Sequence, residues 1–303
     1  MSGEIKSILI VQTAFIGDVV LVEPLVARTK QVFPGAEVDV MVIPAAANLL
    51  ETHPGIRRLL VYDKRGKDRG VAGFRRMLAQ VKQARYDLAL VPHRSLRSAL
   101  MVYLAGIPRR IGFANSAGRW FFTQRLPYLQ DHEVIRNLSL LTPFGAEPLY
   151  RKPEIYPTPA EAARIDRVFG MADGLDIALA PGSVWATKRW PETYFSRLAQ
   201  MLAGMPGARI VLVGSKQDRA IADLIAGPLG KRCLNLAGQL NLRETVAALH
   251  RCRILISNDS APTHLGVAAG CRVITLFGST VPAFGFYPYG EQHRVVETHL
   301  ALD

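Results

Sequence analysis

Short apolar runs alternate with amphipathic stretches along the whole chain. In the first half, five apolar runs predict buried parallel strands, at residues 7–13, 37–43, 59–62, 87–91 and 110–113. Apolar positions at helical spacing predict three helices between them, at residues 19–33, 73–84 and 95–105. The run at 110–113 is short, and we expect it to form an edge strand. This alternation predicts an α/β fold built on a doubly wound parallel sheet.

The same alternation starts again in the second half. It predicts strands at 177–180, 209–214, 253–258 and 273–277, the last of which we expect to be the final strand. It predicts helices at 160–169, 191–202, 218–225, 242–251 and 261–269. Between the halves, residues 150–160 hold three prolines and follow no helical or alternating period, which suits a linker. We therefore predict two Rossmann-like domains, residues 1–155 and 156–303, that face each other across a cleft.

The charge of the chain is strongly positive. Its 37 Lys and Arg residues exceed its 25 Asp and Glu residues, which gives a net charge of +12. Residues 1–150 carry 20 of the basic residues and 12 of the acidic ones, so most of the excess lies in the first domain. Such an excess favours a nucleic acid, an anionic lipid or a phosphorylated substrate, and a solvated basic surface is the alternative.

The sequence disfavours a membrane-spanning protein and a secreted protein. No stretch reaches the roughly 18 uninterrupted apolar residues of a membrane span, and the first residues lack the features of a signal peptide. We therefore expect a cytoplasmic protein. The three cysteines, Cys233, Cys252 and Cys271, form no C-x-x-C pair, so neither a disulfide framework nor a zinc site is indicated.

The first strand-to-helix turn, residues 12–18, carries a carboxylate. Gly17 permits a tight backbone there, and Asp18 comes at the start of the following helix. Asp18 is either a helix cap or a general base that takes a proton from an attacking hydroxyl. The turn lacks the G-x-G-x-x-G pattern, which argues against a nicotinamide-dependent enzyme.

A turn in the second half, residues 180–191, has the features of an anion site. Small residues at Gly182 and Ser183 let backbone N–H groups approach an anion, and Thr187 and Lys188 follow in the same loop. Arg189 adds a second cation just before a helix that is expected to begin at Pro191. These features favour a pyrophosphate clamp. The alternative is that Trp190 packs under the loop while Lys188 is solvated.

Two later turns offer further polar groups. Asp218 follows the strand at 209–214 and either bonds ribose hydroxyls or caps a helix. Asp259 ends a strand, Ser260 stands at an N-cap position, and Ala261 begins a helix whose N-terminus suits a diphosphate. His264 lies one turn into that helix and faces either the ligand or the core.

Together these segments resemble glycosyltransferase family 9, the ADP-heptose:lipopolysaccharide heptosyltransferases. The matching segments span nearly the whole chain, and they are QTAFIGDVVLVEPL at 12–25, HEVIRNLSLL at 132–141, APGSVWATKRWP at 180–191, LVGSKQD at 212–218 and NDSAPTHLGVAAG at 258–270. Within the family, the chain is most similar to the heptosyltransferase II group. The resemblance implies a GT-B fold with an N-terminal acceptor domain and a C-terminal domain for the nucleotide sugar. It also implies inverting transfer of L-glycero-D-manno-heptose from ADP-heptose to the inner core of lipopolysaccharide.

The resemblance also implies roles for individual residues. Asp18 matches the family's catalytic carboxylate, Lys188 its phosphate-contacting lysine, and Asp218 its acidic ribose contact. The segment from Asp259 to His264 matches the donor-binding motif, although it has Ala and Pro where the family more often has Gly and an apolar residue. Members of the family normally continue beyond the position that matches Asp303, with a further segment and a last helix that returns to the N-terminal domain.

The mechanism that follows needs no metal or other cofactor. Asp18 deprotonates the acceptor hydroxyl, while Lys188, Arg189 and the helix N-terminus stabilise the leaving diphosphate. The acceptor is an anionic glycolipid, and we expect three arginines to bind its anionic groups, since guanidinium forks match phosphate. These are Arg94, Arg97 and Arg119.

Several readings stay open. The basic residues Lys64, Arg65, Lys67 and Arg69 either approach a membrane surface, which would make the protein peripheral, or are solvated. His132 and Arg136 share a helical face and either line the cleft or support it. The alternative functions are another GT-B nucleotide-sugar enzyme such as an epimerase, or an inactive nucleotide-sugar-binding homologue. A nucleic-acid partner is not expected, because aromatic–basic strand platforms and helix-turn-helix patterns are missing.

Overall fold

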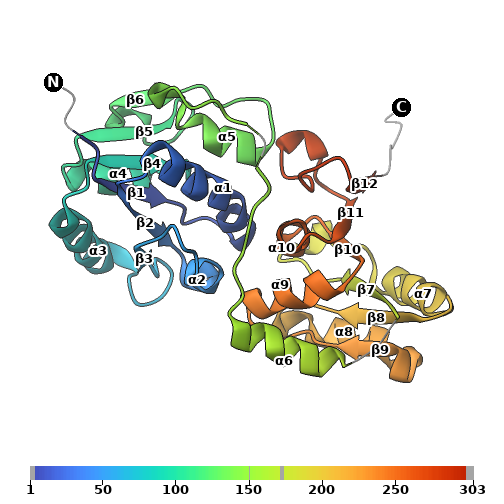
Figure 1. Cartoon of the computed structure of the whole chain (residues 1–303). Helices are drawn as coiled ribbons and strands as arrows, with labels where there is room; N and C mark the ends of the chain where they lie inside the picture. Colours follow the sequence, from blue (N-terminus) through green and yellow to red (C-terminus); the bar gives the residue numbers. More distant parts are fainter. Residues whose placement is uncertain (1–3, 150, 171–173, 298–303) are drawn as a thin grey trace, which may run out of the picture. The chain divides into compact units, whose positions relative to one another are not determined.

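In a computed structural model, the alternation of strands and helices forms two separate α/β units. The structure describes residues 4–149, 151–170 and 174–297 (Figure 1). Contacts divide the chain into Met1–Pro153 (unit 1) and Glu154–Asp303 (unit 2), against an expected boundary at 155/156. Residue 150 of the expected linker and the chain end at 303 lie outside the described residues.

Unit 1 is built on a six-stranded parallel sheet. Its strands are β1 (Ser7–Val11), β2 (Glu37–Val42), β3 (Arg58–Val61), β4 (Leu88–Val91), β5 (Arg109–Phe113) and β6 (Gln124–Leu126). They lie in the order β3-β2-β1-β4-β5-β6, and every pair is parallel. The predicted α/β class is therefore confirmed in this half.

Helices cover both faces of this sheet. They are α1 (Ile16–Val32), α2 (Pro44–Leu50), α3 (Gly70–Ala84), α4 (Leu96–Leu104) and α5 (Glu133–Ser139), with 3-10 turns η1 (Arg119–Phe121) and η2 (Thr142–Phe144). Helix α1 packs against α2 and α5, whereas α3 packs against α4 (Figure 1). Alternate strand residues such as Leu9 and Val11 are buried under α3 and α4 together with Val81 and Val102, as the two-residue period of a strand requires.

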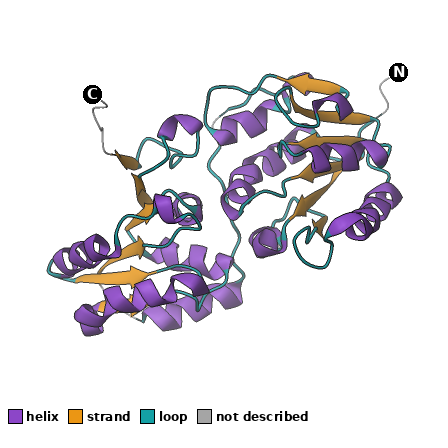
Figure 2. Ribbon diagram, turned by 180° about the vertical axis from the view of Figure 1, so that it is seen from behind, coloured by secondary structure: helices purple, strands orange, loops and turns teal. Residues whose placement is uncertain are grey.

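Unit 2 repeats this plan. Its strands are β7 (Leu175–Ala180), β8 (Ala208–Leu212), β9 (Cys233–Asn235), β10 (Ile254–Asn258), β11 (Arg272–Phe277) and β12 (Arg294–Glu297). Their order, β12-β11-β10-β7-β8-β9, is the same as in unit 1 when the strands of each unit are counted from one, and every pair is parallel. Each unit thus has one sheet with helices on both sides (Figure 2).

The helices of unit 2 also divide between the two faces. They are α6 (Pro159–Phe169), α7 (Glu192–Ala203), α8 (Arg219–Ala226), α9 (Leu242–Arg251) and α10 (Ala261–Ala269), with 3-10 turns η3 (Ala186–Lys188), η4 (Lys216–Asp218), η5 (Gly227–Arg232) and η6 (Pro282–Phe284). Phe195 of α7 and Ile225 of α8 are wholly buried against Ile210 of β8. On the other face, α9 packs against α6 and α10.

The shared strand order fixes where loops meet. In each unit the chain winds outward from the first strand and then returns to add the fourth strand on that first strand's other side. Two pairs of loops therefore begin at neighbouring strand ends. They are the loops after β1 and β4 in unit 1, and those after β7 and β10 in unit 2. Ligands of such sheets bind at this place.

Three sequence predictions about elements are wrong. The run at 110–113 is not an edge strand, because β6 pairs with β5 on its outer side. The strand at 273–277 is not the last, because β12 follows it and pairs with β11. The helix expected to begin at Pro191 begins at Glu192, with Pro191 as its N-cap residue. Strands β6 and β12 are short and largely exposed, so their apolar signal is weak.

No helix within the described ranges is both long enough and apolar enough to span a lipid bilayer.

Candidate functional site

The strand ends of unit 1 are tied together by polar side chains. Thr13, after β1, has its Oγ1 3.0 Å from Nδ1 of His93, which follows β4. The same nitrogen lies 2.9 Å from Oγ of Ser98 on α4. Lys64, after β3, donates a hydrogen bond of 2.5 Å to the carbonyl of Thr13. Three strand ends thus form one polar edge, which we call the unit 1 edge.

Cations surround a neutral imidazole at the unit 1 edge. Burial, together with the charges of Lys64 and Arg94, lowers the pKa of His93 to about 4, so its ring is uncharged at neutral pH. Burial and the nearby Arg65 and Arg97 lower the pKa of Lys64. From the sequence, Lys64 is expected either to approach a membrane surface or to be solvated. In the structure, it is instead a half-buried part of this edge.

Asp18 is the third residue of α1 and not its N-cap residue, but its carboxylate helps to cap the helix, because it bonds the N–H of the N-cap residue Phe15. Its Oδ2 accepts a hydrogen bond of 3.1 Å from the N–H of Phe15, and Gly17 lies beside it in the first helical turn. Burial raises the pKa of Asp18, although the Phe15 hydrogen bond and the charge of Arg94 oppose the shift. A raised pKa makes a carboxylate a better proton acceptor.

A second carboxylate, which the sequence analysis did not single out, lies near Asp18. Glu133 begins α5 and is only 5% exposed. It accepts hydrogen bonds of 3.2 Å from both the hydroxyl of Tyr128 and the guanidinium of Arg136. Burial and then the charge of Asp18 raise its pKa to about 7, while Arg136 opposes the shift. The only sequence signal is its place in the segment 132–141, because the pairing of α1 with α5 is tertiary.

His132 and Arg136 stabilise the segment that carries Glu133. His132 is the N-cap residue of α5, and its Nδ1 accepts a hydrogen bond of 3.2 Å from the N–H of Val134. Arg136 is 2% exposed and donates a hydrogen bond of 2.8 Å to the carbonyl of Leu129. Of the two roles left open by the sequence, the structure favours support.

The three predicted acceptor arginines occupy different surroundings. Arg94 lies 4.3 Å from the ring centre of Tyr128, which Arg136 approaches to 4.4 Å. Arg97 donates a hydrogen bond of 3.1 Å to the hydroxyl of Tyr62. Arg119 lies on η1, 3.8 Å from the ring centre of Trp120. Arg94 and Arg97 therefore belong to the unit 1 edge, whereas Arg119 projects from a separate turn.

In unit 2, an ion pair joins the loops that follow β7 and β10. Nζ of Lys188 lies 2.6 Å from Oδ2 of Asp259, and the Thr280 hydroxyl donates to the same oxygen at 2.6 Å. The side chains of Lys188 and Asp259 are 22% and 8% exposed. Lys188 is therefore paired with Asp259 rather than solvated, which was the alternative interpretation of this loop. Thr280 follows β11, and the sequence analysis did not single it out.

A wholly buried asparagine fastens the loop at 181–190 to β10. Nδ2 of Asn258 donates to the carbonyl of Pro181 at 2.7 Å, and its Oδ1 accepts from the N–H of Trp190 at 2.9 Å. The indole of Trp190 packs against Tyr194 and Phe195, with ring centres 5.4 and 5.1 Å away. The packing role for Trp190 is therefore observed together with the ion pair.

The N-terminus of α10 has fewer free donors than its sequence suggests. Pro262 has no N–H, and the N–H groups of Asp259 and Thr263 bond the carbonyls of Leu276 and Ser260, both at 3.1 Å. Among the residues that the structure describes, the N–H groups of Ser260 and Ala261 have no hydrogen-bond acceptor. The Ser260 hydroxyl does not cap the helix, because it donates to the carbonyl of Asn258 at 3.2 Å.

His264 turns toward the interior of unit 2. Its side chain is only 4% exposed, so it lies mainly among core residues. The other loop residues differ in exposure: Ser183 is buried and Thr187 is exposed. Arg189 donates a hydrogen bond of 2.8 Å to the carbonyl of Ser183, so its guanidinium orders the loop.

Gly182 makes room for Asp218. A Cβ placed on Gly182 would lie 2.1 Å from Oδ1 of Asp218, far closer than atoms approach. The other carboxylate oxygen of Asp218 accepts hydrogen bonds from the N–H and hydroxyl of Ser215, at 2.8 and 2.6 Å. The missing side chain at Gly182 therefore serves close packing between two loops, a reason different from the expected approach of an anion.

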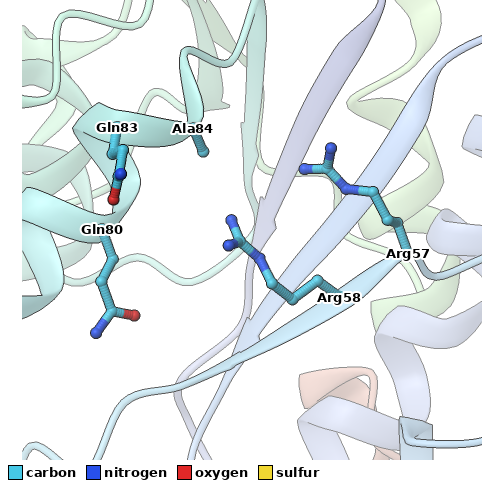
Figure 3. A pocket seen from close by; sticks show the side chains of 5 residues that line it. All are labelled: Arg57, Arg58, Gln80, Gln83 and Ala84. Carbon is cyan, nitrogen blue, oxygen red and sulfur yellow. The ribbon is translucent and has the colours of Figure 1, made fainter.

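A pocket of about 450 Å³ lies between β3 and α3 of unit 1 (Figure 3). It is lined by Arg58, the first residue of β3, by Arg57 just before it, and by Gln80, Gln83 and Ala84 of α3. Both arginines pair with the buried Asp39, at 2.6 and 3.1 Å. The pair of cations is therefore partly neutralised, and the pocket adds nothing to the unit 1 edge.

Within the residues that the structure describes, no group of three or more His, Cys, Asp or Glu side chains is arranged to hold a metal ion. The three cysteines are free thiols there, and burial raises the pKa of Cys233 to about 11 and that of Cys271 to about 12.

Comparisons with known proteins identify relatives. The sequence model of a family described as "Glycosyltransferase family 9 (heptosyltransferase)" matches residues 74–301, about three quarters of the chain. A lipooligosaccharide heptosyltransferase 2 from Haemophilus influenzae is 26% identical over 92% of this chain and 85% of its own length.

Solved structures share the fold. A family 9 glycosyltransferase from Veillonella parvula has a TM-score of 0.89 at 22% identity, covering 100% of this chain and 90% of its own. An ADP-heptose lipopolysaccharide heptosyltransferase II from Escherichia coli has a TM-score of 0.80 at 24% identity, covering 96% and 90%. These similarities confirm the GT-B fold class.

Replacing Gly182 by Ala should destabilise unit 2 by about 1–3 kcal/mol, because the new methyl group overlaps the carboxylate of Asp218. In the Asp218→Ala background, the same Gly182→Ala substitution should cost little, because the carboxylate that the methyl group overlaps is gone. Denaturant unfolding of the four proteins measures the coupling. A cost that persists unchanged in the double variant would locate the strain elsewhere.

Replacing Glu133 by Gln should change how stability depends on pH. The native pKa of Glu133, about 7, exceeds its ordinary value of 4.5, so its contribution is fully present below pH 4.5 and is lost as pH rises to 7. The Gln variant lacks this loss. Its stability relative to the native chain should therefore rise by about 1–3 kcal/mol over this range.

Thermal unfolding at several pH values measures this difference, and the exposed Glu147→Gln is the matched control. Parallel curves for the native chain and Glu133→Gln would contradict the assignment. The constant offset from leaving Arg136 without a carboxylate does not affect the comparison.

Proposed function

The chain belongs to glycosyltransferase family 9 and is a glycosyltransferase, and from that premise we propose that it transfers L-glycero-D-manno-heptose from ADP-heptose to the inner core of lipopolysaccharide. The names of its relatives, which are lipopolysaccharide or lipooligosaccharide heptosyltransferases, support this reaction. We assign the chain to the heptosyltransferase II type, as the sequence analysis does. We also propose that it works in the cytoplasm.

Asp18 is the proposed general base, and its surroundings are the observation that carries the proposal. Its carboxylate lies at the start of α1, directly after β1, with a pKa that burial raises and with Arg94 close by. A carboxylate in such a place can accept the proton of an acceptor hydroxyl as that oxygen attacks. Arg94, Arg97 and Arg119 are proposed to bind the anionic groups of the acceptor, with Gly17 beside Asp18.

Unit 2 is proposed to bind the nucleotide sugar. The cation of Lys188 and the free N–H groups of Ser260 and Ala261 lie at neighbouring strand ends, where a diphosphate can accept hydrogen bonds from them. Asp259 and Thr280 hold Lys188 in place before the donor binds. The proposed donor site also includes Gly182, Ser183, Thr187, Asp218 and His264.

The proposed chemistry is one displacement. The acceptor oxygen forms a bond to the anomeric carbon while the bond from that carbon to the diphosphate breaks, and the proton passes to Asp18. Attack from the face opposite ADP inverts the configuration. The negative charge that develops on the diphosphate is stabilised by Lys188, so the proposal involves no metal ion.

A second candidate is a homologue that binds a nucleotide sugar but transfers a different one or none. A thermal-shift series with ADP, UDP and GDP separates these functions. Stabilisation by ADP alone supports the proposed donor, whereas a preference for UDP would assign the protein to another donor class.

The Asp18→Asn variant should fold normally and lose at least about a hundredfold in kcat, because the amide cannot accept the proton. Initial rates with ADP-heptose and a heptose-bearing lipopolysaccharide acceptor measure the loss. Glu147→Gln, which alters an exposed carboxylate, should leave kcat unchanged. Near-native turnover in Asp18→Asn would remove this residue as the base.

The Lys188→Ala variant should weaken ADP binding by about tenfold or more, because a charge-assisted hydrogen bond is lost and Asp259 is left buried without its cation. Isothermal titration with ADP measures this loss. Arg197→Ala on α7 is the control. Unchanged ADP affinity together with a raised acceptor KM would reassign the loop to the acceptor.

A further inference from the structure

The outer side of α4 exposes large apolar side chains. Leu96, Tyr103 and Leu104 are 51%, 48% and 44% exposed. With Leu100, their spacing of four, seven and eight residues puts them on one face of the helix. The opposite face, which includes Ala99 and Val102, already supplies the core. Packing within unit 1 therefore does not account for this second apolar face.

The turn η1 extends the same surface. Gly118 lies so close to α4 that an added Cβ would be 2.5 Å from Cβ of Ala99. The ring of Phe121 lies 5.0 Å from that of Tyr103, centre to centre. Next to it, Trp120 is 67% exposed. We call Leu96, Leu100, Tyr103, Leu104, Trp120 and Phe121 the α4 surface.

The chain segment that forms the α4 surface carries charge of one sign. Residues 88–130 contain six arginines and neither Asp nor Glu; the arginines are Arg94, Arg97, Arg109, Arg110, Arg119 and Arg125. The guanidinium of Arg119 lies 3.8 Å from the ring centre of Trp120. That of Arg110 lies 5.5 Å from the ring centre of Tyr103 and donates to the carbonyl of Phe121 at 2.7 Å. The exposed apolar side chains thus lie among cations.

We propose that the α4 surface docks on an anionic lipid bilayer. Its leucines and Trp120 would enter the boundary between headgroups and acyl chains, where amphipathic aromatic rings are favoured. The surrounding arginines would contact lipid phosphates, each such contact adding to the attraction. A nucleic acid would also attract arginines and aromatic rings, but the three leucines offer it nothing to stack on or pair with.

Docking at the α4 surface would bring the unit 1 edge close to an acceptor that is anchored in the bilayer. This consequence rests on the proposed function. Helix α4 begins three residues after His93, so Leu96 lies next to the unit 1 edge that holds Arg94 and Thr13. An acceptor with a lipid anchor remains in the bilayer. Docking through α4 brings the unit 1 edge to its headgroup, and the vesicle binding itself requires no transferase activity.

Sedimentation with vesicles tests the proposal on the full chain. Vesicles of phosphatidylcholine containing about one third phosphatidylglycerol should bind the native protein, and pure phosphatidylcholine should bind it at least about tenfold less. Leu104→Glu and Trp120→Glu should each weaken binding about tenfold or more, since each puts a carboxylate against the anionic surface. Both sites are exposed, so folding should be retained. Met201→Glu on α7, at a residue 74% exposed in unit 2, adds the same charge elsewhere and should bind like the native chain.

Other outcomes overturn the proposal. If Leu104→Glu and Trp120→Glu bind vesicles as well as Met201→Glu does, the α4 surface is not the docking site. If the native chain ignores anionic vesicles but binds a single-stranded oligonucleotide that Trp120→Glu does not, the partner is a nucleic acid. Vesicle binding without any transfer from ADP-heptose would refute the proposed function and leave the docking surface intact.

Discussion

The order of the strands is the constraint on which the rest of each unit depends. Because the winding reverses after the third strand, β1 lies beside β4 and β7 lies beside β10. Loop residues that are 80 positions apart in unit 1 and 71 in unit 2 then lie at neighbouring strand ends. The contact between Thr13 and His93 and the ion pair between Lys188 and Asp259 both result from this adjacency.

The carboxylates at the strand ends of the two units have different surroundings. In unit 2 a cation and a carboxylate meet directly, so Lys188 has a fixed position before any ligand arrives. In unit 1 two carboxylates, Asp18 and Glu133, lie near each other, and burial raises the pKa of both. A fixed cation suits the binding of an anion, whereas a carboxylate with a raised pKa suits the acceptance of a proton.

Elements with local end signals were accessible from the sequence. The bounds of α9 and α10 are as predicted, because Asn241 with Glu244 forms a capping box and Gly270 takes the left-handed conformation that ends a helix. Strands β6 and β12 were missed, because a short, exposed edge strand is defined by the neighbour it pairs with. Similarly, the role of Glu133 was missed although it lies in the segment 132–141, because its nearness to Asp18 depends on the packing of α5 against α1.

The sequence by itself determined the α/β class, the division into two similar halves and the turns that carry polar groups, since periodicity, caps and turn residues act over a few positions. Only the tertiary structure decided what those groups contact. It paired Lys188 with Asp259, set Asp218 against Gly182, and turned the leucines of α4 outward. The physical reason is that a side chain's partners depend on which strand ends become neighbours, and pairings between distant strands leave no local pattern in the chain.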